Sequence, residues 1–137
     1  MNIVVDTSVW SLVLRRDTVN EHDAHVRAFR ACIEAGHGLV LLGPILQELL
    51  DGLRSPKQFS RLLSVLDPIP MASLDRGTFV LAARMRNECR NNGIQAGPTD
   101  FLIAAACVES GWPLLTADQD FQRIATRTKL VLIPCDD

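Results

Sequence analysis

The chain has 137 residues, 47% of them hydrophobic, which is enough to enclose the core of one domain but not of two. Its longest apolar runs are broken by charged residues or proline before the length of about 18 residues that a membrane span needs. The N-terminal MNIVVDTSVW lacks the basic segment of a signal peptide, so we expect a soluble, cytoplasmic protein of one domain spanning residues 1–137.

The net charge of -2 provides no overall basic footprint of the kind that nucleic-acid-binding proteins usually carry. Arginines are nevertheless grouped locally, and a local patch can differ in sign from the whole chain. These groups are Arg15 and Arg16, Arg27 and Arg30, and Arg84, Arg86 and Arg90. Any one group on its own is more typical of a solvated helix face than of a binding site.

The first half of the chain alternates short apolar runs with amphipathic segments. In chain order it predicts a strand at residues 3–5, helices at 9–14 and 20–35, a strand at 39–42 and a helix at 44–54. The strands are continuously apolar, which is typical of strands covered on both faces. The helix at 20–35 should end at Gly36 and bury Val26, Phe29 and Ile33, which share one helical face.

The second half continues the alternation. It predicts a helix at residues 57–66, a brief edge strand at 68–71, a helix at 75–91, a helix starting at 97–99, a strand at 113–116, a turn and short helix at 117–126 and a strand at 130–133. The helix at 75–91 should bury Phe79, Ala82 and Cys89. Strands that alternate with helices predict an α/β/α sandwich with a mainly parallel sheet of four to five strands.

Several residue types that often carry chemistry show no suggestive pattern. Four scattered cysteines form no CxxC pair, so we expect reduced, partly buried thiols at Cys32, Cys89, Cys107 and Cys135. His22 and His25 are three residues apart, but Glu21 and Asp23 beside them favour a solvated surface over a metal site. We expect core or dimer packing for Trp10 and Trp112.

Five acidic residues follow predicted strands directly or lie in the first turns of the helices after them: Asp6, Glu48, Asp100, Asp118 and Asp120. In open parallel sheets, ligands bind beyond the carboxyl ends of the strands, so acids at these places are candidates for a site. Each acid alone has an ordinary explanation as a helix cap, a first-turn charge or a turn residue. Glu48 is the hardest to explain in this way, because it flanks a leucine stripe one turn before Gly52.

Carboxylates that meet at one edge of a sheet require a counter-charge. Each close pair would repel by about 4 kcal/mol at an effective dielectric constant of about 20, which folding would not tolerate without a cation. Oxygen ligands with no histidine or cysteine nearby select Mg²⁺ or Mn²⁺ rather than Zn²⁺. One or two such ions could activate a water and hydrolyse a phosphodiester without a covalent intermediate.

Four motifs carry a resemblance that extends over the whole chain: VVDTSVW, ILQELLDGL, GPTDFLIAAAC and LLTADQDF. In order and spacing they resemble the PIN-domain family, specifically the VapC toxins of bacterial toxin-antitoxin pairs. The resemblance implies metal-binding and catalytic roles for Asp6, Glu48, Asp100 and Asp118. It implies a direct or water-mediated contact from Asp120, and leaves open whether Asp118 or Asp120 is the main fourth acid. It further implies that the hydroxyls of Thr7 and Thr116 orient the cluster.

The same resemblance implies an activity and partners. The activity would be that of a Mg²⁺- or Mn²⁺-dependent endoribonuclease, the toxin of a VapBC-type module, which cleaves tRNA, rRNA or mRNA and so inhibits translation and growth. The partners would be RNA, a cognate VapB-like antitoxin whose C-terminal segment lies over the active groove, and a second copy in a homodimer, without a membrane.

Two other functions fit part of this pattern of acids. A phosphoryl-transfer domain with an aspartate nucleophile also places Asp after the first strand. It requires a further acid beside Asp6, where the chain has Thr7 and Ser8, and a pocket lysine, whereas the chain has only Lys57 and Lys129. A binding module without enzyme activity would use the acids only as helix caps, and it predicts no metal dependence.

Overall fold

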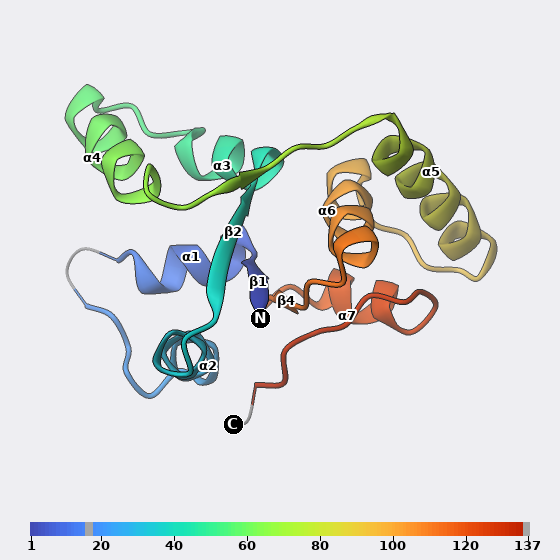
Figure 1. The fold of residues 1–137 in the computed structure, drawn as a ribbon, viewed down its shortest axis with the longest axis horizontal. Helices are drawn as coiled ribbons and strands as arrows, with labels where there is room; N and C mark the ends of the chain where they lie inside the picture. The colour runs from blue at the N-terminus through green and yellow to red at the C-terminus, as the bar shows by residue number, and fades with distance from the viewer. Residues whose placement is uncertain (16–17, 136–137) are drawn as a thin grey trace.

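A four-stranded, all-parallel sheet in the order β3-β2-β1-β4 forms the centre of the molecule (Figure 1). This computed structural model describes residues 1–15 and 18–135, so Arg16 of the first arginine group lies outside the described residues. The strands are β1 (Asn2–Val5), β2 (Gly38–Leu42), β3 (Met71–Ala72) and β4 (Leu114–Leu115). The predicted parallel α/β architecture is confirmed.

Seven helices are found in the described part of the chain and lie on both sides of the sheet (Figure 1). They are α1 (Thr7–Val13), α2 (Ala24–Glu34), α3 (Gly43–Leu50), α4 (Pro56–Leu66), α5 (Arg76–Asn91), α6 (Pro98–Ser110) and α7 (Gln119–Ala125). Figure 1 shows α1 and α2 on one side of β1 and β2, and α6 on the other side with α5 packed against it. None of the described helices is both long and apolar enough to cross a bilayer.

The core lies between the central strands and the helices on either face. Ile3, Val4 and Val5 of β1 are almost completely buried, as a strand between two neighbours and two helical layers must be. Helix α6 is buried on nearly all sides, as its apolar sequence predicted, and only its first and last turns reach solvent. This helix therefore holds its N-terminal residues firmly at one edge of the sheet.

Two predicted helix boundaries were wrong. Helix α2 begins at Ala24 rather than at residue 20, because the Asp23 carboxylate accepts hydrogen bonds from the backbone N–H groups of His25 and Val26 and caps the helix there. Helix α3 ends at Leu50 rather than near residue 54. Gly52 follows with a φ of 84°, a conformation that ends the helix and favours glycine.

Three further expectations need correction. Ile33 and Phe79, both predicted to be buried, are 45% and 54% exposed. Their neighbours Cys32 and Thr78 are buried instead. Val26 of α2 and Ala82 and Cys89 of α5 are buried as expected, so Ile33 and Phe79 lie at the solvent-facing edges of helix faces that are otherwise as predicted. The strand expected at residues 130–133 is reduced to a single bridge between Leu114 and Leu132.

The predictions of free cysteines and of a core position for Trp10 are confirmed. All four cysteines are free, and Cys32, Cys89 and Cys107 are buried. Trp10 is buried and meets the Phe29 ring edge to face, with 5.5 Å between the ring centroids, so it packs in the core and cannot stack on a base.

Candidate functional site

The carboxyl ends of three adjacent strands meet at one edge of the sheet, and four of the five candidate acids belong to the segments that leave it there. Asp6 follows β1, Glu48 lies in the helix after β2, and Asp118 and Asp120 come shortly after β4. Because β1 is paired in parallel with both β2 and β4, these three segments leave the sheet side by side. The fifth acid, Asp100, comes from the first turn of α6.

Asp6 occupies the N-cap position of α1, yet its side chain makes no capping hydrogen bond. Its Oδ2 instead accepts hydrogen bonds from Ser8 Oγ at 2.7 Å and from Thr116 Oγ1 at 2.9 Å. The carboxylate is only 5% exposed and is therefore held away from the helix N–H groups and against the end of β4. The ordinary explanation of Asp6 as a helix cap does not apply.

Ser8 joins the two strand ends and was not singled out from the sequence. Its Oγ donates to Asp6 and accepts a hydrogen bond from the Ala117 backbone N–H at 2.9 Å. Thr116 Oγ1, which donates to Asp6, accepts from the Asp118 backbone N–H at 3.0 Å. These hydroxyls therefore fix the relative positions of Asp6 and the turn that carries Asp118. The signal that could have revealed Ser8 is a hydroxyl two residues after an aspartate at a strand end.

Asp100, Asp118 and Asp120 form the most compact part of the site. One carboxylate oxygen from each lies within 4.8 Å of the other two, although Asp100 begins α6 and the others begin α7. Asp118 does cap its helix, accepting from the Asp120 backbone N–H at 2.9 Å. Asp120 forms an ion pair with Arg123, so one of the three charges is partly balanced within the protein.

The pKa values of Asp100 and Glu48 are raised by burial and by the charges of the other acids. Burial, and then the charges of Asp118, Asp120 and Asp6, raise the pKa of Asp100 to about 6, against a small opposing effect of the Gly97 backbone. The pKa of Glu48 is also raised, first by burial and then by Asp6, while Thr7 lowers it. Asp6 and Glu48 stand outside the compact trio, but they interact electrostatically with it.

The donor set fits a hard divalent cation. Only carboxylate and hydroxyl oxygens surround the site, and no histidine or cysteine joins the three acids among the described residues. Thr7 Oγ1 is buried and influences Glu48, yet it is the one buried side-chain polar atom in the described ranges without a hydrogen bond of ordinary geometry. Lys57 and Lys129 are both exposed, which leaves the site without the lysine that a phosphoryl-transfer domain requires.

The comparison with protein families decides the classification. The family model of the PIN domain matches residues 3–127, nearly the whole chain. The chain belongs to the PIN-domain family. The PIN-domain resemblance of the four sequence motifs is thereby confirmed.

Solved structures of the same fold include several toxin-antitoxin proteins. VapBC2 from Rickettsia felis, bound to a DNA fragment from its promoter, superposes with a TM-score of 0.77 at 19% identity, covering 99% of this chain and 100% of the other. FitAcB from Neisseria gonorrhoeae superposes with a TM-score of 0.71 at 22% identity, covering 98% and 97%. VapC20 from Mycobacterium tuberculosis, described as a sarcin-ricin loop cleaving toxin, superposes with a TM-score of 0.65 at 16% identity, covering 93% and 98%. No curated protein sequence matches this PIN domain.

Proposed function

We propose that this PIN-domain protein is a metal-dependent endoribonuclease and the toxin of a VapBC-type toxin-antitoxin module that acts in the cytoplasm. The observation that carries the proposal is the meeting of Asp100, Asp118 and Asp120 within 4.8 Å, beside a buried Asp6. Such a concentration of negative charge destabilises a protein unless a cation binds to it. The pKa values of Asp100 and Glu48, raised first by burial and then by the neighbouring carboxylates, are consistent with that repulsion.

In this proposal Asp6, Glu48, Asp100 and Asp118 are the metal-binding and catalytic acids, and Asp120 adds a contact to the ion. Mg²⁺ or Mn²⁺, when bound, would polarise the scissile phosphodiester and acidify a water. The Glu48 carboxylate, whose pKa is raised by burial and by Asp6, is suited to take a proton from that water. Thr116 holds Asp6 in place by a hydrogen bond, and Thr7, which lowers the pKa of Glu48, would orient Glu48 when the ion is bound.

Partners are inferred from the similar structures. VapBC2 is a complex bound to promoter DNA, and VapC20 is described as a toxin that cleaves the sarcin-ricin loop, which is RNA. By analogy we infer a cognate VapB-like antitoxin that covers the acidic groove, a homodimer, and a structured cellular RNA as substrate, whether tRNA, rRNA or mRNA.

The decisive experiment compares wild-type protein with Asp6→Asn, purified free of any antitoxin. The wild type should cleave RNA in Mg²⁺ or Mn²⁺ and lose the activity in EDTA. Asp6→Asn should be inactive while keeping the fold, because the amide has the same shape and can still accept from Ser8 and Thr116. Sequencing of RNA 5′ ends after induced expression of each form would identify the target. Equal cleavage by both proteins would show a contaminating nuclease and refute the proposal.

A further inference from the structure

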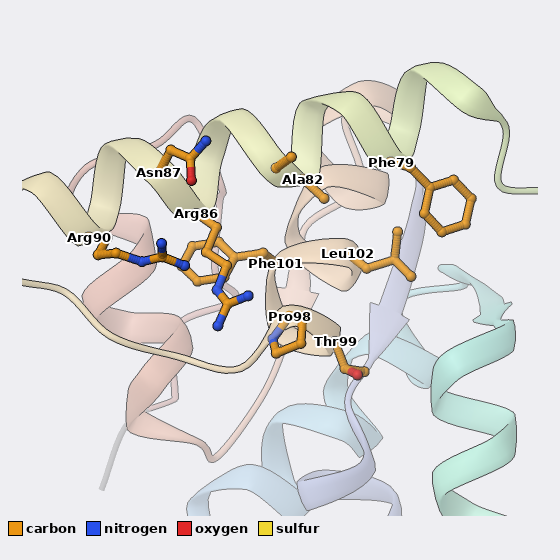
Figure 2. Close-up of a pocket in the computed structure, with 10 residues that line it drawn as sticks. Phe79, Ala82, Arg86, Asn87, Arg90, Pro98, Thr99, Phe101 and Leu102 are labelled. Atoms are coloured by element: carbon orange, nitrogen blue, oxygen red, sulfur yellow. The ribbon is translucent and has the colours of Figure 1, made fainter.

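A groove between α5 and α6 plays no part in the chemistry described so far (Figure 2). Its volume is about 390 Å³, within the range of about 300–1,000 Å³ that is usual for small-ligand pockets. Pro98 and Thr99 line the groove and belong to the same first turn of α6 as Asp100 of the acidic trio. One end of the groove therefore lies close to the helix turn that carries Asp100.

One wall of the groove carries two arginines without acidic partners. Arg86 and Arg90 stand one turn apart on α5, and in the described ranges neither side chain forms an ion pair or a hydrogen bond. Figure 2 shows Arg86 extending from α5 toward Pro98 at the start of α6. The same two arginines also line a second hollow of about 320 Å³ next to the loop after α5, so they stand between two adjoining depressions.

This local charge contrasts with that of the whole chain. Helix α5 carries four arginines and one glutamate, whereas the protein has a net charge of -2. Two like charges one helical turn apart repel each other, and no acid of the described residues forms an ion pair with either of them. An anion would balance them, and arginine is the side chain best shaped to bind phosphate with two parallel hydrogen bonds.

The end of the groove opposite Arg90 is apolar. Phe79 is 54% exposed, Leu102 is half-buried, and both line the groove. Figure 2 shows the Phe79 and Leu102 side chains at the end of the groove away from Arg90. A phosphate-binding end and an apolar end in one groove match the two parts of a nucleotide, because every base offers a flat π-face to aromatic and aliphatic side chains.

We propose that this α5–α6 groove binds a nucleotide of the RNA next to the cleaved bond, with Arg86 and Arg90 on its phosphate and Phe79 and Leu102 against its base. The proposal rests on the ribonuclease function proposed above. It assigns the arginines to positioning of the substrate rather than to catalysis, since they lie outside the acidic cluster.

The test measures binding of a short fluorescein-labelled single-stranded oligouridylate by fluorescence anisotropy, with every variant made in the Asp6→Asn background to prevent cleavage. The test variant is Arg86→Ala/Arg90→Ala. The matched control is Arg76→Ala/Arg84→Ala, which removes the same charge from exposed positions of the same helix that do not line the groove. Thermal melting confirms that each variant is folded, and Arg86→Gln/Arg90→Gln replaces the test variant if it is not.

The test variant should bind about tenfold more weakly or worse, and the slope of log affinity against log salt should fall by about 0.7, the loss expected for one neutralised phosphate on a single strand. The control should change affinity less than about twofold, since rim charges off the path of the strand contribute only long-range attraction. Phe79→Ala should weaken binding about fivefold without changing the salt slope, because it removes stacking and no charge.

Equal weakening by the test and control pairs would overturn the proposal, because it would show only diffuse attraction. A shift of the test variant or of Phe79→Ala from dimer to monomer in sedimentation would also overturn it, since the groove would then belong to an interface between copies. Cleavage by wild type together with unchanged oligouridylate binding by the test variant would refute this groove and leave the proposed function standing. Absence of cleavage by the wild type would refute the proposed function itself.

Discussion

Thr116 Oγ1 donates a 2.9 Å hydrogen bond to Asp6 Oδ2, a contact between residues 110 positions apart in the chain. It connects the end of β4 to the end of β1, and Thr116 is itself buried. The bond holds a buried carboxylate in a fixed orientation without any positive side chain of the protein. The bond therefore orients the Asp6 carboxylate and leaves its negative charge available to bind a ligand.

Removal of this bond should destabilise the protein and displace the acid. Thr116→Val keeps the shape of the side chain but leaves Asp6 with one hydrogen bond fewer, so the free energy of unfolding should fall by about 1–3 kcal/mol. Urea denaturation at neutral pH measures the loss. Thr116→Ser is the control, because it retains the hydroxyl and should lose less. A fully stable Thr116→Val would mean that the bond does not constrain Asp6.

Binding of a divalent cation should stabilise the fold. At a Mg²⁺ or Mn²⁺ concentration of about 100 times its Kd, the free energy of unfolding should rise by about 2.7 kcal/mol, seen as a higher Tm. Asp118→Asn should lose most of this rise, because it removes one acid of the compact trio. Asp67→Asn removes an exposed acid at the end of α4 and should keep it. Identical metal responses in the two variants would argue against a site at the trio.

The stability of the metal-free protein should depend on the ionisation of Asp100. Its pKa is about 6 in the folded protein and near 3.8 when unfolded, so the folded state binds more protons between these values. The contribution of Asp100 to stability is therefore most favourable at low pH and is lost as the pH rises through about 4 to 6. Ionised Asp100 then destabilises the fold.

In EDTA at neutral pH, Asp100→Asn should consequently be more stable than the wild type, by on the order of 1 kcal/mol after allowance for solvent screening. The difference should disappear below a pH of about 4, where the carboxyl is protonated in both states. Saturating Mg²⁺ should reverse the order. Chemical denaturation across this pH range tests all three expectations, and a less stable variant in EDTA would contradict the repulsion inferred here.

Glu48 should matter for RNA cleavage more than its acidic neighbour Asp51. Both are exposed near the end of α3, and Asp51 contributes to the raised pKa of Glu48, but Glu48 also interacts electrostatically with Asp6 and Asp118 of the site. Glu48→Gln should reduce the cleavage rate by about 100-fold or more, the usual effect of removing a positioned acid-base group. Asp51→Asn should stay within a few-fold of the wild type. Comparable losses in both variants would indicate a general effect of charge.

Much of the fold could be predicted from periodicity and helix-breaking residues alone. Apolar runs predicted the central strands, and the positions of proline, glycine and Asp75 predicted where α5 and α6 begin. The start of α2 was missed because Asn20 and Asp23 can both cap a helix, and local sequence does not rank them. The exposure of Phe79 was missed because the packing partner, and not the local sequence, decides which side chains at the edge of an apolar helix face are covered.

The candidate site, like the fold, could be predicted only in part from the sequence. Residue order determined which acids follow strands, because the polypeptide direction fixes which side chains leave the carboxyl edge of a parallel sheet. Only the tertiary structure decided how these acids meet. The Asp6 carboxylate does not cap the backbone N–H groups of α1, because the hydroxyls of Thr116 and Ser8 donate hydrogen bonds to it, and Ser8 in turn accepts from the Ala117 N–H, 109 residues away. Contacts between such distant segments arise from packing of the sheet and helices as a whole, and no local pattern encodes them.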